Sequence, residues 1–138
     1  MATDADAMTA ALIWAMTAHL AWTALLYGAL TVARAPAVWG VGQAEDGSNP
    51  FQLYEPRLTA NLRNQFEWPV FFYVACIMLL SGGRPVEAAH VALASAFVVG
   101  RVLHSGVQIL TAQIRLRGIV FTLNFVAVLL LWAAVFHL

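Results

Sequence analysis

The chain has 138 residues, of which 62% are hydrophobic and only 10% are charged. Soluble domains carry roughly 25% charged residues, and a chain this short leaves much of its surface in contact with the solvent. The composition therefore excludes an ordinary soluble domain and predicts a protein whose solvent is lipid. The net charge is zero and the seven basic residues, all arginines, form no basic run, which argues against nucleic acid as a partner.

Four apolar segments follow one another along the chain. A membrane-spanning helix needs about 20 mostly apolar residues, and we predict helices at roughly 8–33, 58–80, 86–110 and 116–137 within one domain, residues 1–138. The first segment follows acidic residues and is longer than the apolar part of a signal peptide, so we interpret it as a retained span. The predicted fold class is an all-α, integral membrane four-helix bundle.

The connections between these helices differ in length and charge. A long loop rich in Gly, Pro and acidic residues joins the first two helices, and a short turn makes the next two a hairpin. Near the first and third connections lie five arginines, Arg34, Arg57, Arg63, Arg115 and Arg117, whereas the opposite side has only Arg84. The positive-inside rule then predicts cytoplasmic loops there and both termini outside the cytoplasm. The absence of targeting signals in a short chain favours a bacterial inner membrane.

The segment "RNQFEWP", residues 63–69, places polar groups at the beginning of the second predicted span. Glu67 follows Asn64 by three residues and Arg63 by four, so the three side chains share one face of a helix. Pro69 favours a kink that turns this face inward. Because a charge within a span costs about 2.5–3.5 kcal/mol on insertion scales, we expect these groups to face the interior of the bundle.

The third predicted helix carries Arg101 and His104 three residues apart, with Gln108 close to the same stripe. One interpretation is structural: Glu67 forms a buried ion pair with Arg63 or Arg101. Against it, the arginines of the cytoplasmic half outnumber the single deep carboxylate. An excess of guanidinium groups indicates an anion supplied from outside, either a phospholipid headgroup or a small carboxylate ligand. Spacing alone does not choose between them.

The segments "RNQFEWPVFFY" and "GRVLHSGVQILTAQIRLRGIVF" resemble the two signature regions of the MAPEG family, membrane-associated proteins in eicosanoid and glutathione metabolism. That family has an Arg-Asn-x-x-Glu run opening its second helix, with a proline soon after. It also has an Arg-x-x-His run on the third helix and an arginine at the start of the fourth. The four-helix layout, the long first loop and the orientation extend the resemblance over the whole chain.

The resemblance implies a homotrimer that binds glutathione between neighbouring subunits on the cytoplasmic side. It assigns glutathione binding to Arg63, Asn64, Glu67, Arg101 and His104, with Arg34 matched more loosely, and stabilisation of the thiolate to Arg117. Glu67 would face the ligand's amine and Asn64 would align its peptide. The second substrate would be an apolar electrophile that arrives from the bilayer, in a reaction of transferase or peroxidase type.

The sequence departs from catalytic relatives at three positions. Those relatives often carry a tyrosine four residues after the histidine, where this chain has Gln108, and Ser or Tyr early in the fourth helix, where it has Gly118 and Phe121. In better-known members those hydroxyls contact the ligand. The sequence therefore favours enzyme-like binding and leaves open whether the protein is an enzyme, a binder of another thiol or a non-catalytic member.

Two other classes of protein remain as alternatives. A small proton-coupled transporter or channel subunit would place its carboxylate near mid-bilayer in the first helix, whereas Glu67 belongs to the second. A purely structural membrane protein would bind no small anion. One cysteine, Cys76, forms no internal disulfide or thiolate metal site, and we interpret His19 and His90 as packing residues, so no metal centre is predicted.

Overall fold

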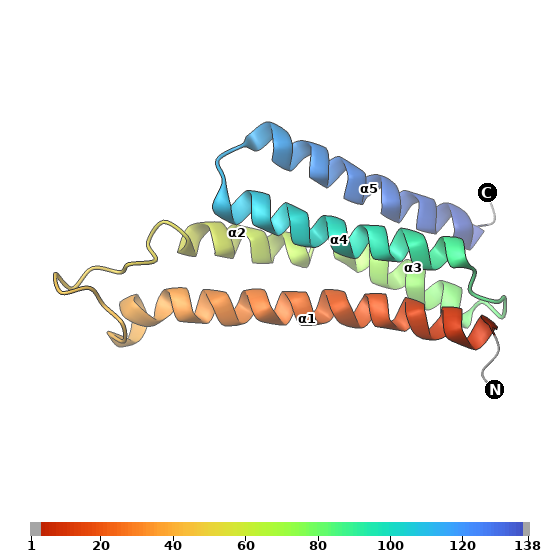
Figure 1. The fold of residues 1–138 in the computed structure, drawn as a ribbon, viewed down its shortest axis with the longest axis horizontal. Helices are drawn as coiled ribbons and strands as arrows, with labels where there is room; N and C mark the ends of the chain where they lie inside the picture. The colour runs from red at the N-terminus through yellow and green to blue at the C-terminus, as the bar shows by residue number, and fades with distance from the viewer. Residues whose placement is uncertain (1–3, 137–138) are drawn as a thin grey trace.

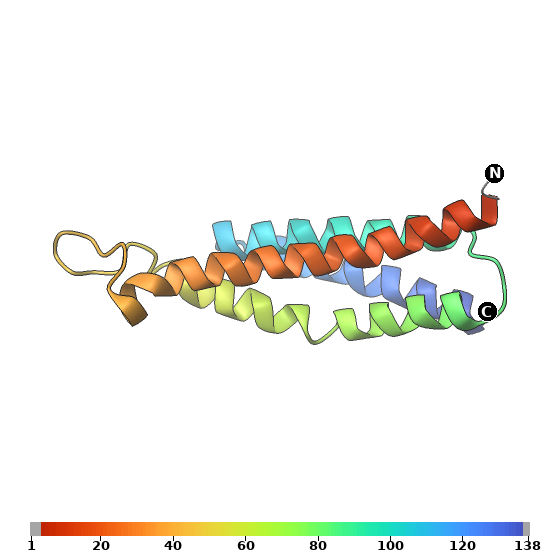
Figure 2. The same cartoon turned by 90° about the horizontal axis from the view of Figure 1, so that it is seen from below.

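The computed structural model describes residues 4–136, and these residues form helices without any strand. The helices are α1 (Asp4–Trp39), α2 (Glu55–Gln65), α3 (Pro69–Ser81), α4 (Ala88–Leu110) and α5 (Ile114–Phe136). Because α2 and α3 follow each other end to end beside α1, the helices form a four-helix bundle (Figure 1, Figure 2). The predicted all-α class is confirmed, although His137, the last residue of the predicted fourth span, lies outside the described residues.

Three helices, α1, α4 and α5, are long and apolar enough to cross a membrane. Their outward side chains are apolar: Leu20, Leu25 and Leu123 are 63%, 66% and 65% exposed. In water such a surface would be a large apolar patch, whereas lipid solvates it without cost. The exposed faces therefore match the lipid environment that the composition predicts.

The second predicted helix is interrupted. α2 ends at Gln65, residues 66–68 are not helical, and α3 begins at Pro69. Pro69 lacks the N–H that would continue the α-helical ladder, and its ring occupies the first position of α3, where a missing donor is tolerated. The kink expected at Pro69 is thus a full break, visible as a gap between the two green helices in Figure 2.

The two ends of the bundle carry different connections. The α1–α2 loop and the α4–α5 connection lie at one end, and the α3–α4 turn lies at the other, beside the beginning of α1 and the end of α5 (Figure 1). At the loop end, Arg57 Nη1 donates to the carbonyl oxygen of Ile109 at 3.0 Å, which satisfies one of the free carbonyls in the last turn of α4. The segments that lead into the α1–α2 loop and the α4–α5 connection, toward this end of the bundle, carry Arg34, Arg57, Arg63, Arg115 and Arg117.

Two apolar clusters form the core, and polar residues lie between them. The larger cluster, near the α3–α4 turn, includes Phe72 and Phe97, whose rings stack with centroids 4.3 Å apart. The smaller cluster joins α1 to α2 through Leu26, Leu30 and Leu62. The buried polar residues of the bundle are His19, Thr23, Asn61, Gln65, Arg101, His104, Ser105, Gln108 and Asn124. A polar layer of this size inside a membrane bundle is costly unless its members hydrogen-bond one another.

Candidate functional site

Arg101 is at the centre of the polar layer and is fully buried. Its Nε donates to Gln65 Oε1 at 3.1 Å, and its Nη2 donates to the backbone oxygen of Asn64 at 2.9 Å. The second contact engages the last turn of α2, where the helix break leaves carbonyl groups without intrahelical partners. Arg101 therefore attaches α4 to the break in α2–α3.

One hollow, which we call the α4–α5 hollow, has a volume of about 310 Å³. It is lined by Asn64, His104, Ile114, Arg117, Gly118 and Phe121. The volume is at the lower end of the roughly 300–1,000 Å³ that small-molecule sites occupy. The hollow thus brings together three predicted site residues, Asn64, His104 and Arg117, from α2, α4 and α5.

A second hollow, which we call the α1–α2 hollow, has a volume of about 460 Å³ and contains three other predicted residues, Arg34, Arg63 and Glu67. Its remaining lining residues are Tyr27, Leu30, Thr59, Leu62 and Phe66. Arg63 and Asn64 are consecutive on α2, and successive helical side chains point about 100° apart. They therefore line different hollows, and a single subunit does not gather the predicted residues into one site.

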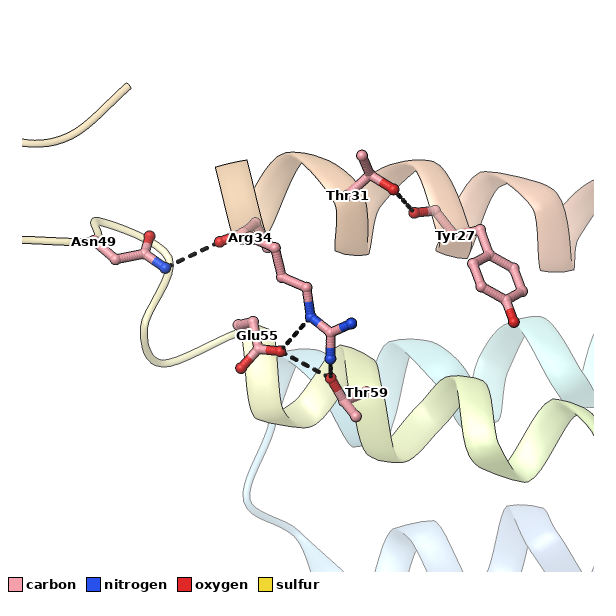
Figure 3. A network of polar contacts seen from close by, with 7 residues as sticks. Tyr27, Thr31, Arg34, Asn49, Glu55 and Thr59 are labelled. Carbon is pink, nitrogen blue, oxygen red and sulfur yellow. Dashed lines mark hydrogen bonds and ion pairs between the residues drawn. The ribbon is translucent and has the colours of Figure 1, made fainter. Parts of the chain in front are cut away.

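Arg34 forms an ion pair with another residue of the same chain. Its Nε donates to Glu55 Oε1 at 2.8 Å and its Nη2 to Thr59 Oγ1 at 3.0 Å, while the Thr59 hydroxyl donates to the same Glu55 oxygen at 3.0 Å (Figure 3). The hydrogen bond from Arg34, and then that from Thr59, lowers the pKa of Glu55 below its ordinary value. This network joins the end of α1 to the first turn of α2.

Glu67 is placed differently from the prediction. It is exposed in the break, near the middle of the α2–α3 pair rather than in the opening turns of a helix, because residues 66–68 are not helical. Arg34 pairs with Glu55, and within residues 4–136 Glu67 forms an ion pair with neither Arg63 nor Arg101. The structural interpretation of Glu67 as a buried ion-pair partner is therefore wrong.

Several buried polar atoms in this region have no hydrogen-bond partner among the described residues: Trp68 Nε1, Arg101 Nη1, His104 Nδ1, and Nδ2 and Oδ1 of Asn124. Native proteins satisfy the large majority of such atoms. They come from the helix break, α4 and α5, and among these residues His104 lines the α4–α5 hollow. His104 Nδ1 is therefore a hydrogen-bonding atom without a partner on a residue of this hollow.

The match to a known family decides the identity. The model of the MAPEG family matches residues 10–137. The chain belongs to the MAPEG family. It is an integral membrane protein, consistent with its three spanning helices. No curated protein and no solved structure matches it significantly.

The structure shows the surroundings of Gln108, Gly118 and Phe121, the three positions where the sequence lacks an expected hydroxyl group. Gly118 and Phe121 line the α4–α5 hollow beside Arg117, so that wall presents no hydroxyl. Gln108 is buried, and its Oε1 accepts hydrogen bonds from Asn61 Nδ2 at 3.0 Å and Asn64 Nδ2 at 3.2 Å. Gln108 therefore supports Asn64, which lines the α4–α5 hollow, from behind.

Asn61, Gln65 and Ser105 were not among the predicted site residues, yet they connect those residues inside the bundle. Asn61 and Gln65 are four residues apart on α2, and Gln65 Nε2 donates to Ser105 Oγ on α4 at 3.1 Å. The sequence carries a signal for the pair: two amides at helical spacing beside an apolar span share one face. The partner across the interface depends on the packing of α4.

Proposed function

We propose that this MAPEG protein binds glutathione, or a similar anionic thiol, in the α4–α5 hollow. The observation that carries the proposal is the meeting of Asn64, His104 and Arg117 in one hollow. Within residues 4–136 the guanidinium of Arg117 makes no hydrogen bond or ion pair, so it is available to an anion. A small peptide thiol offers its thiolate to the cation and its peptide groups to the amide of Asn64.

Arg117 would hold the reacting sulfur of the bound thiol. The thiolate is the nucleophilic form, and a neighbouring cation favours it over the neutral thiol. With Arg117 beside the sulfur, the thiolate would attack an electrophilic carbon that carries a leaving group. The C–S bond of a thioether would form as the bond to the leaving group breaks, and the leaving anion and the thiol proton would both pass to solvent at the open side of the hollow. This chemistry is of transferase type and needs no metal ion.

The division of the predicted residues between two hollows supports a site shared by neighbouring subunits. In a ring of identical subunits each interface joins two different surfaces. A homotrimer could thus place the α1–α2 hollow of one subunit, with Arg63 and Glu67, against the α4–α5 hollow of the next. A carboxylate of the ligand and its ammonium group would then lie near Arg63 and Glu67, partners of opposite charge that the α4–α5 hollow of one subunit does not supply.

An apolar groove gives a route for the second substrate. The groove, of about 620 Å³, runs between α1 and the α2–α3 pair, and its lining is mainly apolar, with Leu20 and Val70 exposed on its walls. Tyr27 and Phe66 line both this groove and the α1–α2 hollow. An electrophile dissolved in lipid could reach the α1–α2 hollow, and with it the shared site, along this continuous surface.

The test is glutathione binding to the purified protein in detergent, measured by calorimetry. A charge-assisted hydrogen bond contributes about 1.5–3 kcal/mol, so Arg117→Gln should weaken binding roughly 10- to 100-fold. Arg115→Gln is the matched control, because Arg115 is exposed two residues away and does not line the hollow. Conjugation to 1-chloro-2,4-dinitrobenzene would then show whether binding leads to transfer.

Saturable binding that is lost in Arg117→Gln and kept in Arg115→Gln supports the proposal. Equal affinities in the two variants, or no binding by assembled wild-type protein, would refute it. Light scattering gives the number of subunits in the same samples, and a monomer that binds with full affinity would exclude a shared site.

A further inference from the structure

A chain of buried side chains crosses the bundle from α1 to the α4–α5 hollow. It begins at His19, which is 1% exposed. His19 Nδ1 lies 2.9 Å from the Tyr73 hydroxyl, and His19 Nε2 lies 3.2 Å from Gln65 Oε1. From the sequence His19 is a packing residue, whereas in the structure both of its ring nitrogens are hydrogen-bonded.

The donor and the acceptor of each hydrogen bond can be assigned from neighbouring groups that can only donate. A guanidinium nitrogen can only donate, so the Gln65 atom that lies 3.1 Å from Arg101 Nε must be the amide oxygen. The same oxygen faces His19, and His19 Nε2 therefore carries the hydrogen. A buried imidazole with no carboxylate partner is neutral, so its Nδ1 accepts the hydrogen of the Tyr73 hydroxyl at 2.9 Å. The other acceptor near that hydroxyl, the carbonyl oxygen of Met16, lies farther away at 3.3 Å.

Ser105 identifies the nitrogen of the Gln65 amide, independently of the contact with Arg101. Its hydroxyl donates to the backbone oxygen of Arg101 at 2.9 Å, and its oxygen accepts from the donor-only indole of Trp22 at 3.2 Å. The hydroxyl hydrogen is thus already used, and the Gln65 atom 3.1 Å away must be the amide nitrogen. Two separate contacts therefore give Gln65 the same orientation.

The orientation of Gln65 fixes the orientations of two further amides, Asn61 and Gln108, and through them that of Asn64. Gln65 Nε2 donates to Asn61 Oδ1 at 3.3 Å, which leaves Asn61 Nδ2 to donate to Gln108 Oε1 at 3.0 Å. That oxygen also lies 3.2 Å from the Asn64 amide, which must present its nitrogen there. The Asn64 oxygen remains without a partner among the described residues, and Asn64 lines the α4–α5 hollow.

We propose that His19 is a positioning residue that, together with Arg101 and Ser105, holds the Gln65 amide in one orientation. It acts through Gln65, Asn61 and Gln108 to present the Asn64 oxygen as an acceptor in the α4–α5 hollow. The ligand it selects carries an N–H donor, a peptide amide or an ammonium group, near the anion held by Arg117. The inference rests on the proposed function for the identity of the ligand. The orientation of the side chains is independent of that function.

Two measurements test the proposal. The first is the ¹⁵N NMR spectrum of histidine-labelled wild-type protein, with His19 assigned by comparison with His19→Gln. The neutral tautomer with the hydrogen on Nε2 is expected, and a hydrogen on Nδ1 alone would overturn the proposal. This measurement needs no ligand, so its outcome is separate from that of the proposed function.

The second measurement compares glutathione binding by His19→Gln and His19→Leu. The Gln amide nitrogen can take the place of Nε2, whereas Leu fills the space without donating. His19→Gln should bind within about threefold of wild type and His19→Leu about five- to tenfold more weakly. If His19 only packed, the apolar Leu would be tolerated at least as well as Gln, and that order overturns the proposal. Absence of wild-type binding would instead contradict the proposed function.

Discussion

The contact between Gly100 and Asn124 offers a quantitative test of how α4 and α5 pack. A Cβ added at Gly100 would collide with Asn124 Oδ1 and lie 2.9 Å from its Cγ. Asn124 is 1% exposed, so its amide has little room to move aside. Overpacking in a close-packed interior costs about 1–3 kcal/mol, and we expect Gly100→Ala to lower the free energy of unfolding by that amount.

The double-mutant cycle with Asn124→Ala isolates the cause. Without the amide the collision disappears, and Ala is preferred over Gly in a helix interior by about 0.5–1 kcal/mol. Gly100→Ala should therefore be slightly stabilising in the Asn124→Ala background. The assay is denaturant unfolding in detergent micelles, followed by circular dichroism. The same loss of stability in both backgrounds would refute the reasoning, because it would place the strain elsewhere than at Asn124.

Two further predictions concern the loop end and the core. Arg34 and Thr59 lower the pKa of Glu55 in the folded protein. The stability that the ionised Glu55 carboxylate contributes is therefore fully present above the ordinary pKa range of a glutamate, and it is lost as the pH falls through the lowered pKa. The difference in melting temperature between wild type and Glu55→Gln should accordingly shrink from pH 7 to pH 3, whereas the alternative, a constant difference, would mean that the ion pair has no role. Cys76 is fully buried, so it should resist maleimide labelling in the folded protein and react after denaturation; rapid labelling of the folded protein would contradict the packing of α3.

Much of the fold was predictable because it follows from local properties. Apolar segments long enough to cross a membrane give α1, α4 and α5, and a proline ends a helical ladder wherever it occurs. What local reasoning underestimated was the interruption at residues 66–68, because it predicted one kinked helix over 58–80. α2 begins slightly earlier, at Glu55, where Pro56 near the first position and the contacts of Leu58 and Leu62 with α1 stabilise the helix. Glu67 therefore lies in the break between two helices rather than within one.

The sequence indicates which residues belong to the candidate site, but it does not indicate how those residues are arranged in space. The spacing of Arg63, Asn64 and Glu67 indicated a shared helical face, but the break at residues 66–68 removes the regular geometry on which that argument depends. Arg34 also received a partner, Glu55, that lies 21 residues away. No sequence pattern specifies such a contact, because it depends on how the loop returns the chain to α1.

The sequence by itself determined the lipid environment, the helical class, the membership in the MAPEG family and the residue types available for chemistry. These depend on composition, covalent geometry and short motifs, which act locally. Only the tertiary structure decided that Asn64, His104 and Arg117 share one hollow while Arg63 and Glu67 lie in another. It also decided that His19 reaches Asn64 through a chain of amides. The face that a helix presents to its neighbours is set by the packing of the whole bundle.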